Sequence, residues 1–176
     1  MPTSSRLRRL DTLVDMPLYR ISRLLAEAGG LVVRVCEGRF GITRREWRVM
    51  SYLALTEGLS PTMLAHQAGL DKAQASRVVA SLLEKGLVER ITKPSDRRHA
   101  VVTLTERGQQ IHDEVLPLAR RINQELLSAL TPQEVDWLDG VLDRLQVQAE
   151  LVAAAFDAEL PRAQRHKGHV RGRSAS

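Results

Sequence analysis

The chain has 176 residues, 43% of them hydrophobic, which is enough for one domain with a substantial core but short for two independent domains. A single cysteine, Cys36, excludes an internal disulfide, and no stretch approaches the roughly 20 apolar residues that span a bilayer, so the sequence predicts a cytoplasmic protein with no membrane partner. The formal net charge is +5, but five positive charges follow Pro161 and three precede Leu10, so residues 10–161 carry a net charge of −3. Any nucleic-acid site must therefore depend on the local placement of charge.

The N-terminal half of the chain predicts four helices. Residues 1–13 form a basic tail in which we expect no packed structure. The segment 14–42 holds a first helix from about residue 17 to residue 37, interrupted by Gly29-Gly30, which mark either a kink or the close approach of another helix. Thr43 and Glu46 predict a capping box at the start of a second helix. A third helix begins at Ser60-Pro61 and ends at Gly69, and a fourth runs from Asp71 to Gly86.

A hairpin and two longer helices follow. Residues 87–91 and 100–104 are short β-branched runs that suit the arms of an antiparallel ribbon, and the turn residues between them predict a projecting tip. Thr105 begins a fifth helix that continues to about Ala129 and bends at Pro117. Thr131 caps a sixth helix, and residues 161–176 form a second basic tail without expected structure.

The third and fourth helices have the spacing of a helix-turn-helix. Small residues at Ala65 and Ala75 let two helices cross closely, and Gly69 supplies the turn between them. The start of the fourth helix carries side chains that can bond base edges, and the hairpin tip is basic. A solvated polar face is the alternative interpretation. The candidate DNA-binding residues are Ser60, Thr62, Lys72, Gln74, Ser76, Arg77, Lys93, Asp96, Arg97 and Arg98.

Leu87-Val88-Glu89-Arg90, followed by Asp96-x-Arg98 and Leu104-Thr105, resembles the signature of the MarR family of bacterial transcriptional regulators, over about residues 17–157. The resemblance implies a mainly α fold with a small β-ribbon wing. A winged helix-turn-helix at 43–104 would lie between dimerisation helices at 14–42 and 105–160, and the homodimer would bind a pseudo-palindromic operator in double-stranded DNA. It also implies that Arg98 enters the minor groove and that Asp96 holds it there.

Many members of that family leave DNA when they bind a small aromatic carboxylate or phenolic effector, so the resemblance also implies an effector site. Arg23 matches an arginine that contacts carboxylates in relatives that respond to aromatic acids, and a guanidinium suits a carboxylate. For the aromatic and methionine candidates, packing in the core is the alternative role. The candidate effector-binding residues are Tyr19, Ser22, Arg23, Trp47, Met50 and His112.

The sixth helix has apolar residues at alternating steps of three and four, which is typical of a seam for another helix, in this chain or in a second copy. The candidate dimerisation residues are Leu138, Leu142, Leu145, Val152 and Phe156. We expect Cys36 to be a packing residue and not a peroxide sensor. No metal-ligand spacing, cofactor motif or catalytic motif is present, so we expect no metal, no cofactor and no enzyme activity.

These patterns together predict a homodimeric DNA-binding regulator, a repressor that leaves its operator when an effector binds. Two alternatives stay open. A ligand-independent or architectural DNA-binding protein would also use the basic tails, and a helical interaction module would use the seam of the sixth helix.

Overall fold

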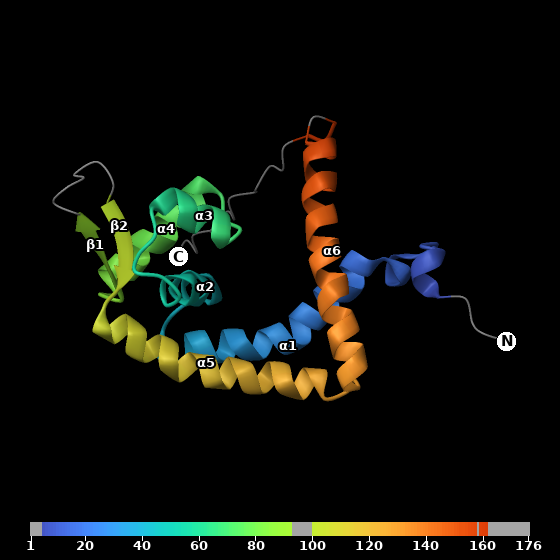
Figure 1. Cartoon of the computed structure of the whole chain (residues 1–176), viewed down its shortest axis with the longest axis horizontal. Helices are drawn as coiled ribbons and strands as arrows, with labels where there is room; N and C mark the ends of the chain where they lie inside the picture. The colour runs from blue at the N-terminus through green and yellow to red at the C-terminus, as the bar shows by residue number, and fades with distance from the viewer. Residues whose placement is uncertain (1–4, 93–99, 158, 162–176) are drawn as a thin grey trace, which may run out of the picture. The chain divides into compact units, whose positions relative to one another are not determined.

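The structure, a computed structural model, describes residues 5–92, 100–157 and 159–161. The predicted tip residues Lys93, Asp96, Arg97 and Arg98 and the predicted tail after Pro161 lie outside these ranges. The chain divides into two compact units, Met1–Ser128 and Ala129–Ser176, and each is described by itself. Figure 1 shows their elements in chain order.

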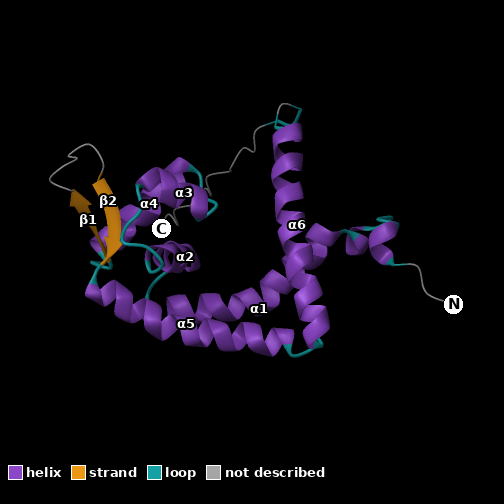
Figure 2. Cartoon of the chain, viewed as in Figure 1, coloured by secondary structure: helices purple, strands orange, loops and turns teal. Residues whose placement is uncertain are grey.

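The first unit holds five α-helices and one hairpin among its described residues (Figure 2). Two short 3-10 turns, η1 (Arg6–Arg8) and η2 (Leu13–Asp15), precede them, and η1 lies in the segment where the sequence predicts no structure. The expectation that Gly29-Gly30 interrupt the first helix is wrong, because this helix is continuous. The elements are α1 (Pro17–Phe40), α2 (Arg44–Leu53), α3 (Pro61–Gln67), α4 (Lys72–Glu84), β1 (Val88–Thr92), β2 (Ala100–Leu104) and α5 (Glu106–Leu127).

Local capping chemistry explains where these helices begin. Thr43 and Glu46 cap α2 reciprocally, as predicted, and the side chain of Ser60 accepts a hydrogen bond from the backbone N–H of Met63 at the start of α3. Gly69 adopts φ +60° in the turn between α3 and α4, a conformation that glycine takes without steric cost. Thr105 caps α5, which continues through Pro117 as a single helix, as the sequence predicts.

The hairpin pairs β1 with β2 in antiparallel register, from Val88 opposite Leu104 to Thr92 opposite Ala100. Leu59, in the loop before α3, bonds to Val102 through both backbone groups, at 3.1 and 2.9 Å. This bridge extends the ribbon towards the helix-turn-helix. This bridge is not predictable from the sequence, because one paired residue gives no alternating pattern.

The core lies where α2 meets α1, α4 and α5, and the hairpin closes it from one side. α1 and α5 lie side by side (Figure 1). Gly108 in α5 allows the close approach of the hairpin, because a Cβ at this position would lie 2.0 Å from the carbonyl oxygen of Leu87. The largest fully buried side chains include Ile42, Met50, Leu53, Leu64, Leu82, Leu87, Val102 and Val115.

The described part of the second unit is dominated by α6 (Pro132–Phe156), which Thr131 and Glu134 cap as predicted. α6 contains no buried residue. Leu138 is half-buried, whereas Leu142, Leu145, Val152 and Phe156 are each 45–50% exposed, so most of the predicted seam is exposed among the described residues. None of the helices in the described part of the chain is long and apolar enough to cross a membrane.

Candidate nucleic-acid interface

α4 presents one exposed polar face near its N-terminus. Lys72, Ser76 and Arg77 are exposed there, while Ala75, Val79 and Leu82 on the opposite face are buried against the rest of the unit. The hydrophobic face therefore fixes which way the polar side chains point. All three of these predicted DNA-binding residues are exposed in the first half of α4.

Gln74 has a second role in the structure. Its backbone N–H donates to Oδ1 of Asp71 at 2.7 Å, and its side-chain oxygen accepts weakly from the N–H of Asp71 at 3.4 Å, which completes a capping box. Gln74 is half-buried. A base contact by Gln74 would compete with the longer of these two bonds, whereas Ser76 and Arg77 carry no such constraint. Of the other predicted residues in this region, Ser60 is the half-buried cap of α3 and Thr62 is exposed on its first turn.

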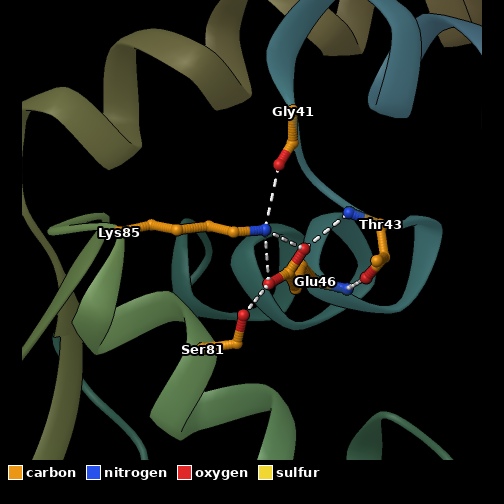
Figure 3. Close-up of polar contacts among 5 residues, drawn as sticks. All are labelled: Gly41, Thr43, Glu46, Ser81 and Lys85. Carbon is orange, nitrogen blue, oxygen red and sulfur yellow. Dashed lines mark hydrogen bonds and ion pairs between the residues drawn. The ribbon is translucent and has the colours of Figure 1, made fainter.

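A buried polar cluster fixes α4 against α2 (Figure 3). Glu46 is 2% exposed, and its carboxylate accepts hydrogen bonds from the Nζ of Lys85 at 2.8 and 2.9 Å and from the hydroxyl of Ser81 at 2.7 Å. Lys85 also donates to the carbonyl oxygen of Gly41, the residue that ends α1, at 2.9 Å. Glu46 additionally accepts from the N–H of Thr43. The cluster therefore joins the end of α1, the start of α2 and the end of α4.

The charge of Glu46 is stable in this position. Burial alone would raise the pKa of its carboxyl group, but the hydrogen bonds from Lys85, from the backbone of Thr43 and from Ser81 together hold the pKa below its ordinary value. Glu46 is therefore ionised at neutral pH, and Lys85 neutralises it. The capping role of Glu46 is predictable from the sequence, but its pairing with Lys85, which lies 39 residues away in the chain, is not.

A groove of about 240 Å³ lies beside this cluster, between α2 and α4. Arg45 of α2 and Arg77 of α4 both line it, and both are exposed. Arg77 is predictable from the sequence as a DNA-binding residue but Arg45 is not, because only the packing of α2 on α4 places both beside one groove. The remaining lining residues are Thr43, Glu46, Gln74, Val78 and Ser81.

A second cavity, of about 290 Å³, lies along another face of α2. Trp47, one of the predicted effector residues, lines it together with Arg44, Arg48, Ser51, Tyr52 and Leu55. The indole N–H of Trp47 is buried and has no hydrogen-bond partner among the described residues. Arg48 donates to the carbonyl oxygen of Ala68 at 3.0 Å, so this guanidinium is partly committed to the end of α3.

The other predicted effector residues do not line this cavity. Met50 is fully buried in the core, and His112 is buried with its Nδ1 3.1 Å from a carboxylate oxygen of Asp113. On α1, Arg23 is exposed, and the hydroxyl of Ser22 donates to the carbonyl oxygen of half-buried Tyr19 at 2.7 Å. An effector role for these five residues stays a prediction.

Comparison with known proteins gives a consistent result. A family model described as the MarR family matches residues 40–99. A putative transcriptional regulatory protein for the hcr operon of Thauera aromatica is 32% identical over 108 residues, which cover 61% of this chain and 65% of that protein, just under two thirds of its length. The multiple antibiotic resistance protein MarR of Escherichia coli K12 is 26% identical over 131 residues, which cover 74% of this chain and 91% of that one.

Solved structures have the same fold. A MarR/EmrR family transcriptional regulator from Acinetobacter sp. ADP1 superposes with a TM-score of 0.73 and 27% identity, over 80% of this chain and 99% of that one. A probable transcriptional regulator from Pseudomonas aeruginosa gives a TM-score of 0.60 and 29% identity, over 72% of this chain and 96% of that one. The prediction of a mainly α winged helix-turn-helix fold is confirmed.

Proposed function

We propose that this chain, a member of the MarR family of winged-helix transcriptional regulators, acts as a homodimeric repressor. The dimer binds a pseudo-palindromic operator and leaves it when a small aromatic acid or phenol binds. Members of this family are DNA-binding regulators and not enzymes, in agreement with the absence of catalytic motifs. The proposal concerns the partner, the assembly and the effector.

The observation that carries the proposal is the exposed polar face of α4 beside the hairpin. Lys72, Ser76 and Arg77 project from the first half of α4, the part of a recognition helix that contacts base edges in the major groove. The Glu46–Lys85 pair and the capping box at Asp71 hold α4 in a fixed orientation. A pre-oriented helix loses less conformational entropy when it binds.

Exposed apolar surface supports the dimer. On α1, Leu18, Ile21 and Leu25 are 79%, 39% and 49% exposed, and on α6 Trp137 is 68% exposed. Side chains of this size at regular helical spacing are expensive to leave in water, at roughly 25 cal/mol per Å² of apolar surface. The same kind of surface on a second copy would cover them, because a two-fold interface pairs a patch with itself.

The cavity along α2 supports an aromatic anion as effector. Trp47 and Tyr52 supply aromatic surface, and Arg44 supplies a guanidinium that can bind a carboxylate through two parallel hydrogen bonds. α2 also carries Glu46, which contacts α4 through Ser81 and Lys85. A ligand that shifts α2 would therefore shift α4, which gives the effector a physical route to the DNA-binding face.

Fluorescence anisotropy tests the DNA-binding part of the proposal, with a duplex recovered by selection from a random library. Arg98→Ala in the predicted wing and Arg77→Ala in α4 should each weaken binding by about 1 to 3 kcal/mol at fixed salt, without changing the oligomeric state. Arg121→Ala, which removes the same charge from an exposed position on α5, is the control. Equal losses in all three variants would mean that charge alone, and not this face, binds DNA.

Tryptophan emission tests the effector part. In a Trp137→Phe variant, Trp47 is the remaining tryptophan of the chain. Titration with benzoate, salicylate and 4-hydroxybenzoate should quench its emission over the concentration range that releases the duplex. Arg44→Ala should weaken both responses, whereas Arg23→Ala should do so only if the anion is bound at α1. Release from DNA without any change in Trp47 emission would place the effector elsewhere.

A further inference from the structure

We propose that Arg45 of α2 and Arg77 of α4 together bind one backbone phosphate of the DNA, in the groove between the two helices. Arg45 would then be a DNA contact outside both the recognition helix and the hairpin. The inference rests on the proposed function, because it requires that α4 faces DNA.

The groove has two cationic walls from different helices. Arg45 and Arg77 both line its volume of about 240 Å³, and both side chains are exposed. Neither forms an ion pair with any described carboxylate, whereas Lys85 and Arg39 do. Two guanidinium groups beside the same groove repel each other unless an anion lies between them, so the groove favours a negatively charged ligand.

The one carboxylate that lines the groove does not neutralise these arginines. Glu46 accepts hydrogen bonds from Lys85, Ser81 and the N–H of Thr43, and the ammonium group of Lys85 balances its charge. The Glu46–Lys85 pair therefore adds no net charge beside the groove. With Glu46 balanced by Lys85, the two arginines give the groove a net charge of about +2, since the remaining lining residues, Thr43, Gln74, Val78 and Ser81, are uncharged.

Phosphate is the anion that fits this arrangement. A guanidinium group presents a planar set of N–H donors that matches phosphate oxygens, and Thr43 and Gln74 add neutral polar groups to the lining of the groove. The groove is continuous with the exposed face of α4 through Arg77, which belongs to both. A helix in the major groove lies between two phosphate backbones, so a backbone phosphate would reach this groove when α4 contacts bases.

Arg45→Ala in the full-length chain tests the inference by anisotropy on the selected duplex between 50 and 300 mM KCl. A phosphate contact adds about 0.9 to the slope of log K against log salt. Because Arg77 stays on the shared phosphate, loss of Arg45 from both protomers should flatten the slope by at most about 1.8. Affinity at 100 mM KCl should fall roughly tenfold, equally on the selected site and on a scrambled duplex, because a phosphate carries no sequence information. Arg45→Lys should keep the slope, and Arg121→Ala should keep both slope and affinity.

A methylphosphonate scan identifies the phosphate. Wild-type protein should lose affinity when one backbone phosphate of each half-site is replaced by the uncharged methylphosphonate, and Arg45→Ala should lose little more at that position. Unchanged affinity and slope in Arg45→Ala, with Arg77→Ala still impaired, would overturn the inference and leave the proposed function intact. A second result would also overturn the inference: inorganic phosphate at millimolar concentration raises the melting temperature only when Arg45 is present, while Arg45→Ala binds DNA as wild type does. The groove would then bind a free anion and not a DNA phosphate. A wild-type protein that binds no duplex would overturn both proposals.

Discussion

The ammonium group of Lys85 lies 2.8 Å from Oε2 and 2.9 Å from Oε1 of Glu46, and this pair fixes the end of α4 against the start of α2. Lys85 is about one third exposed, whereas Glu46 is almost fully buried. Loss of the ion pair would therefore affect the carboxylate most, since a buried charge without a counter-charge strongly lowers the free energy of unfolding. Ser81 and the carbonyl oxygen of Gly41 complete the contacts of the pair.

Removal of the ammonium group should destabilise the first unit. Lys85→Met keeps the aliphatic chain but leaves Glu46 buried and charged, and we expect a loss of roughly 2 to 4 kcal/mol in the free energy of unfolding. Urea denaturation followed by circular dichroism measures it. Lys72→Met, at an exposed position on the same helix, should stay within about 0.5 kcal/mol of wild type. Similar losses in the two variants would show that the pair contributes nothing specific.

The same pair should make stability depend on pH. The folded-state pKa of Glu46 is below its ordinary value of 4.5, so its contribution is fully present above that value and is lost as the pH falls through the folded-state pKa. Glu46→Gln removes this titration and keeps the shape of the side chain. The wild type should therefore exceed Glu46→Gln in stability most at about pH 7, and by less at each step below pH 4.5. A difference that stayed constant from pH 7 to pH 3 would contradict the assignment.

Substitution by alanine at two helical glycines should change the stability of the fold in opposite directions. A Cβ at Gly108 would lie 2.0 Å from the backbone oxygen of Leu87, so Gly108→Ala should cost about 2 kcal/mol or more through overpacking. A Cβ at Gly30 in α1 would meet nothing within 4 Å, so Gly30→Ala should stabilise by about 1 kcal/mol through helix propensity. Thermal unfolding of the two variants tests the pair. Stabilisation by Gly108→Ala would show that α5 does not approach the hairpin this closely.

Cys36 should not act as a redox sensor. Its side chain is fully buried, and burial, followed by the nearby charge of Glu37, raises the pKa of its thiol. The thiolate fraction at neutral pH is therefore small. The folded protein should react with Ellman's reagent only at the rate of unfolding, and Cys36→Ala should respond to hydrogen peroxide in the DNA-binding assay as wild type does. Rapid labelling of the native protein would refute this.

Local chemistry made most of the fold predictable. Thr43, Asp71 and Thr131 begin helices through bonds within three residues, and the β-branched arms of the hairpin pair as an antiparallel ribbon, as predicted. Contacts between distant residues were not predictable in this way. Lys85 contacts Glu46, and Arg45 and Arg77 line the same groove, only because α2 packs on α4, and no spacing in a single sequence encodes that arrangement.

In the candidate site, too, the features set by local sequence were predictable and those set by packing between distant residues were not. The exposed face of α4 follows from its helical period, and Lys72, Ser76 and Arg77 were named from sequence. The other residues depend on tertiary packing. Met50 is an effector candidate in the sequence but lies in the core, and Arg44, which the sequence did not single out, lines a cavity. A Cβ at Gly29 would lie 3.2 Å from a guanidinium nitrogen of Arg44, so Gly29 of the glycine pair marks the close approach of α2 and no break in the helix.

Selection of duplexes from a random library by the full-length protein, with the mass of the recovered complex measured in solution, tests the central claim most directly. We expect enrichment of a pseudo-palindrome whose half-sites lie about one helical turn apart, roughly 34 Å, bound by two copies of the chain. Two copies are required because one exposed face of α4 contacts one half-site, and the site must mirror the two-fold axis of the dimer. Recovery of no common sequence, or of a site without symmetry bound by a single chain, would contradict the account.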